Sequence, residues 1–370
     1  MSDTPSADTP SAHTPSAARA RATIRTAVIG YGLAGAVFHA PLIDAVDGLE
    51  LTAVVTGNAE REAAARDRYP GLRVFGTADE LWAVADSVDL VVVASPNSSH
   101  LPLALAALDA DLPVVVDKPV AASVAEAERL RDAAAAAGLL LSVFQNRRWD
   151  GDLLTLQKLR ADGALGDVHR FESRFERWRP QVATGAWRER PDPGEGGGLL
   201  LDLGAHLVDQ ALTLFGPVTS VFAEVRIVRP GALVDDDVFV ALTHASGTVS
   251  HLWASAAAAD LGPRLRVLGS RAAYVKSGLD VQEAALRAGG TPRDAGWGTE
   301  PEAAWGRVGT PGDTSVVPTL PGAYQNFYAG VRDALLTGGE PPVSVDEAIE
   351  ALTVIEAARL SSAERRVVSL

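Results

Sequence analysis

Short apolar runs alternate with helical patterns in the first part of the chain. Several runs are almost entirely apolar, as expected for parallel strands that are covered on both faces. Capping-box matches at Thr77/Glu80 and Ser123/Glu126 predict helix starts between the runs, and Gly138 predicts a helix end. This alternation predicts a doubly wound parallel sheet of the α/β class. The predicted strands span residues 24–29, 49–56, 88–94, 113–117 and 139–144, with a helix over 32–46 after the first.

The pattern changes after Gln145, where apolar and polar residues alternate with a period of two. Such stretches predict the antiparallel strands of a second, α+β domain. They span residues 168–175, 218–228, 238–245 and 248–254. A glycine-rich segment at 194–198 precedes a predicted helix over 199–215, and a closing helix is predicted over 346–361. Residues 289–322 hold many Gly and Pro and are predicted to form a long loop.

The N-terminal residues have a different character. Residues 4–18 read TPSAD-TPSAH-TPSAA, a low-complexity repeat that cannot bury enough surface to order itself. The segment lacks the basic start and apolar core of a signal peptide. We therefore expect a disordered tail over residues 1–22, a first domain over 23–145 and a second over 146–370.

Composition and charge narrow the classes of partner. The 370 residues carry a net charge of −14, which should repel nucleic acid and anionic membranes. No apolar run reaches the roughly 18 residues needed to span a bilayer. The chain has no cysteine, so disulfides, thiolate metal sites and cysteine nucleophiles are excluded. A cytoplasmic location fits these features, and we expect a small-molecule partner.

The glycine turn Gly30-Tyr31-Gly32-Leu33-Ala34-Gly35 follows the first predicted strand and opens a helix. Gly30 permits the tight bend, Gly32 lets the backbone approach a pyrophosphate, and Gly35 allows close contact between helix and strand. The helix N-terminus then offers N–H groups and partial positive charge to phosphates. This context favours a Rossmann dinucleotide site over a purely structural turn. The predicted cofactor contacts are Gly30, Gly32, Leu33, Ala34 and Gly35.

The end of the second strand bears on the choice of cofactor. NAD-binding folds usually place Asp or Glu there for the ribose 2′-hydroxyl, whereas this chain has Thr56-Gly57-Asn58, with Arg61 just beyond. No acid would repel a 2′-phosphate, so NADP is preferred and NAD remains the alternative. Asn58 is a predicted cofactor contact. Arg61 could instead be an ordinary solvated helix residue.

Two further segments follow predicted strands at the edge where open α/β sheets bind ligands. Ser95-Pro96-Asn97 comes after the strand over 88–94, and His100 lies three residues on. Asn97 could line the cofactor, cap a helix, or both. Asp117-Lys118-Pro119 follows the next strand. A lysine there could polarise an oxygen whose charge changes during hydride transfer, although surface lysines are the commoner case.

Asp202 and His206 are spaced i, i+4 on the predicted helix over 199–215 and should share one face. A neutral histidine held by a carboxylate suits general acid/base chemistry near pH 7, and Asp202 is the expected partner. Asp209 lies three residues further and could also lie beside His206. A buried histidine bonded within its own helix is the alternative. No clear further ligand supports a metal site.

These motifs together resemble the glucose–fructose oxidoreductase/inositol dehydrogenase family (Gfo/Idh/MocA). The resemblance rests on AVIGYGLAG at 27–35, VVVASPNSSH at 91–100, VVVDKPVA at 114–121 and GGLLLDLGAHLVDQ at 197–210, and it extends from Arg25 to the C-terminus. The family usually has Glu-Lys-Pro where this chain has Asp117-Lys118-Pro119. FHAPLID, QNRRWDGD and AWRER further resemble the NADP-dependent scyllo-inositol dehydrogenase branch, which tends to carry arginine at the position of Asn58.

The resemblance implies an enzyme that moves a hydride between nicotinamide and a secondary alcohol or ketone of an inositol, polyol or sugar-like substrate. Reduction of another ring or imine, or a non-catalytic NADP-binding sensor, are the alternatives. The family also implies a homodimer or homotetramer. The implied catalytic set is Lys118, Asp202 and His206. Further implied cofactor contacts are Ser95, Asn97, His100, Asp117, Lys118 and Arg188, and implied substrate contacts are Lys118, Arg148, Trp149, His206 and Tyr324, with Trp187 a weaker candidate.

Overall fold

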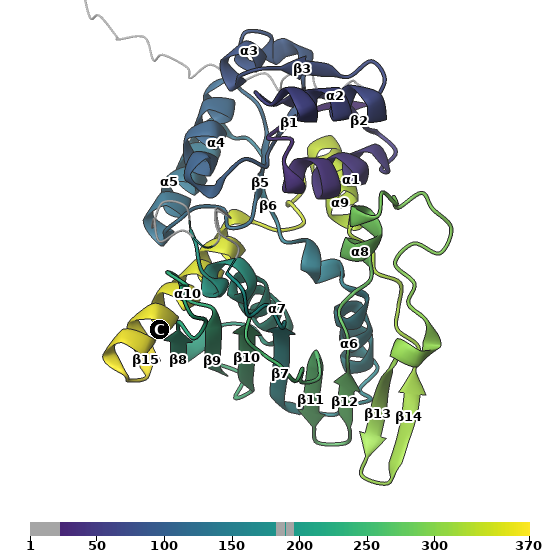
Figure 1. Ribbon diagram of the computed structural model, residues 1–370, viewed down its shortest axis with the longest axis vertical. Coiled ribbons are helices and arrows are strands. Elements are labelled where there is room, and N and C mark those ends of the chain that lie inside the picture. The colour runs from purple at the N-terminus through teal and green to yellow at the C-terminus, as the bar shows by residue number, and fades with distance from the viewer. Residues whose placement is uncertain (1–22, 183–188, 190–195) are drawn as a thin grey trace, which may run out of the picture.

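The computed structural model describes residues 23–182, 189 and 196–370, so the predicted tail at 1–22 lies outside the described residues. Two sheets dominate the architecture, and Figure 1 shows the first in the upper half of the view and the second in the lower half. Within the described ranges, no helix has both the length and the apolar content to cross a bilayer.

The first sheet confirms the predicted parallel α/β architecture. It has six parallel strands in the order β3-β2-β1-β4-β5-β6. Strand β1 lies between β2 and β4, with Ile29 opposite both Val55 and Val93. The strands are β1 (Ile24–Ile29), β2 (Leu49–Val55), β3 (Arg73–Phe75), β4 (Leu90–Val93), β5 (Val114–Asp117) and β6 (Leu141–Phe144).

The helices between these strands begin where the capping signals predicted. The Thr77 hydroxyl accepts from the N–H of Glu80 at the start of α3, and the Ser123 hydroxyl accepts from the N–H of Glu126 at the start of α5. Gly138 ends α5 in the left-handed conformation. The helices are α1 (Ala40–Asp44), α2 (Ala59–Arg68), α3 (Ala78–Trp82), α4 (His100–Asp109) and α5 (Val124–Ala137).

Two predicted helices begin with π-helical geometry. The helix after the glycine turn is π-helical over Ala34–His39 before it continues as α1. The helix predicted over 199–215 is π-helical over Leu200–Gly204 and then continues as α7 (Ala205–Phe215). Such segments are rare and occur often at functional sites.

The second sheet has nine strands in the order β14-β13-β12-β11-β7-β10-β9-β8-β15. All neighbouring pairs are antiparallel except β7 and β10, which are parallel, so the sheet is mostly rather than wholly antiparallel. The strands are β7 (Val168–Glu176), β8 (Val218–Arg226), β9 (Asp237–His244), β10 (Val249–Ser255), β11 (Leu265–Gly269), β12 (Ala273–Lys276), β13 (Gly306–Thr310), β14 (Asp313–Val317) and β15 (Val368–Ser369).

The prediction of a long loop over 289–322 is wrong in part, because residues 306–317 form the β13–β14 hairpin. Glycine and proline in such a segment usually indicate a loop. Gly309 instead has a φ of +146°, and its α-carbon packs so closely on the backbone of Asp313 that a side chain would not fit. Glycine at this position is therefore required by the hairpin, and it does not indicate a loop.

The last helices connect the two sheets. Helix α10 contacts α5 and strand β6 of the first sheet, and α7 and strand β8 of the second. In Figure 1 it runs down to the lower left and ends beside β15, at the edge of the second sheet. Just before it, the carbonyl of Val343 accepts from the N–H of Val143 and the hydroxyl of Ser142 in β6. The remaining helices are α6 (Gly151–Ala161), α8 (Gln282–Arg287), α9 (Gln325–Thr337) and α10 (Val345–Glu364).

Candidate active site

A cavity of about 470 Å³ lies at the carboxyl ends of the first sheet's strands. The register explains why separate loops meet there, since Ile29, Val93 and Val116 lie side by side and Asp117 lies opposite Phe144. The segments that follow these strands therefore share one edge. The cavity wall is completed from the second half of the chain by residues that include Arg177, Asp202, His206 and Glu283.

Glycine is needed at the three positions of the turn for different reasons. Gly30 has a φ of +98°, and a Cβ there would lie 2.6 Å from the carbonyl oxygen of Ala94. A Cβ on Gly35 would lie 1.9 Å from the carbonyl oxygen of Gly30. Gly32 is different, because the nearest atom to its Cβ position is Nη1 of Arg61 at 3.6 Å. The fold itself therefore requires Gly30 and Gly35, whereas Gly32 leaves open space for a ligand on the cavity wall.

These residues fit a dinucleotide. Gly30, Gly32, Leu33 and Ala34 line the cavity, as predicted for cofactor contacts, and Gly35 lies behind them as a packing residue. The open side of Gly32 is where a pyrophosphate can approach the backbone.

The end of β2 brings Arg61 to the cavity. Asn58 caps α2, its side chain accepting from the N–H of Arg61 at 2.9 Å, and it does not line the cavity. Arg61 does line it, and its guanidinium lies beside Gly32. Arg61, rather than Asn58, is therefore the residue of this segment that can bind a phosphate.

The segment after β4 contributes Ser95, Pro96 and Asn97 to the wall. His100 does not line the cavity. It is buried, and its two ring nitrogens lie 2.8 and 3.0 Å from the carbonyl oxygens of Pro119 and Ser95. Burial lowers the pKa of His100. The prediction of a direct cofactor contact is therefore corrected, since His100 joins two wall segments from behind.

Lys118 and Asp202 form an ion pair on the cavity wall. The Lys118 ammonium lies 2.8 Å from Oδ1 of Asp202 and donates to its backbone carbonyl at the same distance. Both side chains are about one-seventh exposed, 15% and 13%. The pair joins the carboxyl end of β5 to the π-helical start of the α7 helix.

His206 takes its orientation from a residue that the motifs did not suggest. Its Nδ1 lies 3.0 Å from the side-chain oxygen of Gln145. Since that oxygen only accepts, Nδ1 carries the proton and Nε2 is left as the proton acceptor of the ring. The expectation that Asp202 orients His206 is thus corrected. A carboxylate gains more from the ammonium of Lys118 than from a neutral imidazole.

The electrostatic surroundings keep His206 neutral. Burial lowers its pKa well below the usual value, and the charges of Lys118, Arg147, Arg264 and Arg177 lower it further. The ring is 5% exposed and lies on the cavity wall. An uncharged imidazole whose acceptor nitrogen has no hydrogen-bond partner among the described residues is in the state that a general base requires.

The carboxylate of Asp117 is fixed by the backbone of Lys118 and by the buried side chain of His39. Its carboxylate accepts from the N–H of Lys118 at 2.8 Å and lies 3.7 Å from Nε2 of His39, whose Nδ1 meets the Tyr328 hydroxyl at 2.5 Å. Burial alone would raise the pKa of Asp117, but His39 and the Lys118 charge lower it below its usual value. The wall beside Lys118 therefore carries a fixed negative charge.

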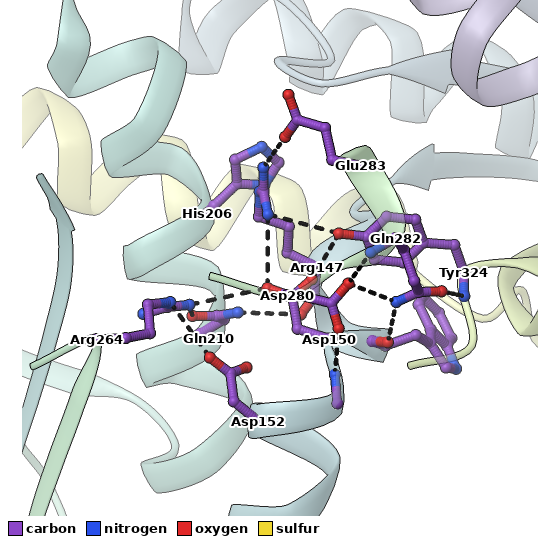
Figure 2. A network of polar contacts seen from close by, with 12 residues as sticks. Arg147, Asp150, Asp152, His206, Gln210, Arg264, Asp280, Gln282, Glu283 and Tyr324 are labelled. Carbon is purple, nitrogen blue, oxygen red and sulfur yellow. Dashed lines mark hydrogen bonds and ion pairs between the residues drawn. The ribbon is translucent and has the colours of Figure 1, made fainter. Parts of the chain in front are cut away.

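Arg147 links the cavity to a buried polar network, shown in Figure 2. It donates to Glu283 at 2.6 Å on the cavity side and lies 3.6 Å from Asp150 on the inner side. Arg264 lies 3.9 Å from the same carboxylate, and Tyr324 donates to it at 2.7 Å. Burial raises the pKa of Asp150 to about 8, which favours its protonated form near neutral pH.

Three predicted substrate residues lie away from the cavity. Arg148 is held by Asp209 and Glu347, at 2.7 and 2.8 Å. Tyr324 is fully buried in the network of Figure 2, and Trp149 packs edge-on against Phe327. Their prediction as substrate contacts is corrected, because internal partners already use their polar groups or rings. Trp187 and Arg188 lie outside the described residues.

Sequence reasoning missed Gln145, Arg147, Arg177 and Glu283 as parts of the site. The rule that found Lys118 could have found Gln145, since it directly follows β6 just as Lys118 follows β5. Arg177 and Glu283 come from the second half of the chain, and only the tertiary fold brings them to this edge.

Comparisons with known proteins identify the family of this chain. Residues 24–145 match the oxidoreductase family with an NAD-binding Rossmann fold, and residues 153–275 match the GFO/IDH/MocA C-terminal domain. The chain is 35% identical to the scyllo-inositol 2-dehydrogenase (NADP(+)) IolW of Bacillus subtilis, over 94% of this chain and 96% of that protein. It is 41% identical to the oxidoreductase YdgJ of Escherichia coli, over 94% and 99%.

A solved structure shows the same architecture. The oxidoreductase yvaA from Bacillus subtilis superposes with a TM-score of 0.88 at 34% identity, covering 94% of this chain and 98% of that one. Fold, glycine turn and relatives agree on a nicotinamide-dependent dehydrogenase or reductase that acts on CH–OH groups. The chain belongs to the GFO/IDH/MocA oxidoreductase family.

Proposed function

We propose that the protein transfers a hydride between a nicotinamide dinucleotide and a secondary alcohol or ketone of an inositol, polyol or sugar-like substrate. When bound, the nicotinamide supplies the hydride acceptor or donor. The observation that carries the proposal is the convergence of Lys118, Asp202 and His206 on one cavity wall beside the glycine turn. A pure cofactor sensor would not need this set.

Each of the three residues has a distinct role. Nε2 of His206 accepts the proton of the substrate hydroxyl while the carbon gives up its hydride, and returns that proton in the reverse direction. Lys118 donates a hydrogen bond to the same oxygen and stabilises the negative charge that develops on it. Asp202 holds the ammonium of Lys118 in position, 2.8 Å away.

Arg61 supports NADP as the preferred cofactor. It is the cation that the end of β2 brings to the cavity, and none of the three residues directly after that strand, Thr56-Gly57-Asn58, is an acid that would repel a 2′-phosphate. The name of IolW includes NADP(+), which points the same way. Fluorescence titration of the protein with NADPH and NADH measures the preference directly, and tighter binding of NADH would refute it.

The central test is His206→Ala with a polyol screen. We expect turnover to fall by about 10²–10⁴, the usual range of general acid/base help, while the Kd for NADPH is unchanged. Because the pKa of His206 is lowered, the wild-type rate of alcohol oxidation should stay level from pH 8 down to pH 6.5. Unchanged turnover in the variant, with substrates that the wild type accepts, would refute the proposed base.

We also propose a homo-oligomeric assembly and a location for the protein. One face of the second sheet carries the partly exposed rings of Phe239, His251 and Trp253 in mutual contact, with ring centroids 5.1–6.0 Å apart. Together with the family resemblance, this face supports a homodimer or homotetramer, which light scattering of the purified protein would measure. The proposed compartment is the cytoplasm.

A further inference from the structure

Arg177 lies on the cavity wall in a segment whose backbone is firmly held. It directly follows β7, and its N–H donates to the carbonyl of Ser255 at 2.8 Å. Its own carbonyl accepts from the N–H of Ala258 at 3.1 Å. The end of β10 therefore fixes the position from which the side chain projects, and the side chain reaches the cavity.

Four other cations on the cavity wall already have acidic partners. Lys118 pairs with Asp202, and both Arg147 and Arg287 bind Glu283. Arg229 is likewise bound by Asp236 and Glu189, at 2.8 and 2.9 Å. Arg177 and the exposed Arg179 differ from these four, since no hydrogen bond or ion pair reaches either guanidinium from residues 23–182, 189 or 196–370.

Arg177 is the less exposed of these two arginines, and its charge is poorly solvated. Burial lowers the pKa of Arg177, and the nearby charge of Arg179 lowers it further. A cation that has lost water without gaining a partner is costly, and an oxygen ligand would remove that cost. The position favours a ligand that supplies acceptors from within the cavity.

Arg177 lies near the reacting groups. Its charge is among those that lower the pKa of His206, beside that of Lys118, and Asp202 and Glu283 act on Arg177 in turn. A substrate oriented for proton transfer to His206 therefore lies within the reach of the Arg177 charge. A guanidinium offers parallel N–H donors in one plane, which match two adjacent oxygen atoms.

We propose that Arg177 determines substrate specificity by donating to two adjacent oxygens of the substrate, next to the carbon that reacts. The inference rests on the proposed function and names the substrate feature that this site selects. Two neighbouring hydroxyls of a polyol and a carboxylate of a sugar acid both present that pair of acceptors. A monohydric alcohol presents neither.

The test compares Arg177→Gln and Arg177→Lys with wild type on scyllo-inositol, glucuronate and cyclohexanol. Arg177→Gln should raise KM about 10- to 100-fold for whichever of the first two the wild type accepts, the loss expected for hydrogen bonds from a charged group. The KM for cyclohexanol and the Kd for NADPH should not change. Arg177→Lys should recover part of the loss. Arg307→Gln, on exposed β13, is the matched control.

The two substrate classes distinguish the source of the oxygens. A loss confined to glucuronate identifies a carboxylate, and a loss on scyllo-inositol identifies paired hydroxyls. An unchanged KM in both Arg177 variants, for substrates that turn over, overturns the inference and leaves the proposed function intact.

If no substrate turns over, calorimetric titration of the NADP complex with substrate distinguishes the proposed role of Arg177 from the proposed function. Binding of scyllo-inositol or glucuronate that depends on Arg177, without turnover, supports the inference and overturns the proposed function. Neither binding nor turnover in the wild type overturns both.

Discussion

The tautomer of His206 depends on a single side chain, Gln145. An accepting oxygen 3.0 Å from Nδ1 leaves Nε2 free to take a proton. We expect Gln145→Leu, which keeps the size but removes the acceptor, to lower kcat about tenfold, the cost of losing one orienting hydrogen bond. The measurement is kcat against pH for alcohol oxidation.

Gln145→Glu is the informative partner variant. It keeps an acceptor but adds a negative charge, which raises the pKa of a neighbouring histidine. The acid limb of the rate profile should therefore move to higher pH, whereas Gln145→Leu should not move it that way. A purely structural Gln145 would lower stability in both variants and leave the shape of the profile alone.

At the scale of residues, the sequence predicted which side chains line the cavity better than it predicted which side chains they bind. Strand ends and the i, i+4 spacing identified Lys118, Asp202 and His206, and all three line the cavity. The spacing could not show that Asp202 would bind Lys118, which is 84 residues away in the chain. Arg148 and Tyr324 were misassigned because an internal carboxylate satisfies each of them, and such pairs form only in the folded chain.

At the scale of elements, the glycine turn separates a structural requirement from a binding requirement. Gly32→Val should fold with an almost unchanged Tm, since the nearest atom to its Cβ position is 3.6 Å away. It should lose NADPH binding in a fluorescence titration, because the side chain fills the space beside the backbone N–H groups.

Gly35→Ala serves as the contrasting variant. Its Cβ would collide with the carbonyl oxygen of Gly30 at 1.9 Å, so it should lower Tm itself. Tight NADPH binding by Gly32→Val would show that the turn is only structural.

Most strands and the capped helices were predictable because local patterns determine them. Apolar runs gave β1, β4 and β5 to within two residues, and the side chains at Thr77 and Ser123 marked helix starts. The π-helical openings at Ala34–His39 and Leu200–Gly204 were not predictable. Both contribute residues to the cavity wall, and their geometry depends on the tertiary contacts made there.

At the scale of the molecule, α10 should make the two sheets unfold together, since it contacts elements beside each of them. Ile355 is 1% exposed in this helix, and Ile355→Ala should cost about 2–5 kcal/mol of unfolding free energy. Loss of bound NADPH fluorescence and loss of far-UV circular dichroism should shift to the same lower temperature.

Leu360→Ala is the matched control, because Leu360 lies in the same helix and is 41% exposed. It should change Tm little. Two separate transitions in Ile355→Ala would show that α10 does not couple the halves.

The hydrogen bonds between β6 and Val343 have a consequence for synthesis of the chain. Strand β6 is the edge of the first sheet, and its partner carbonyl comes 201 residues after Ser142. At 5–20 residues per second, a ribosome needs roughly 10–40 s to add that length. Throughout that interval the nascent first sheet has an uncovered edge, the feature that invites pairing with other chains. Chaperones that shield nascent chains should therefore matter most to this protein before its last 30 residues emerge.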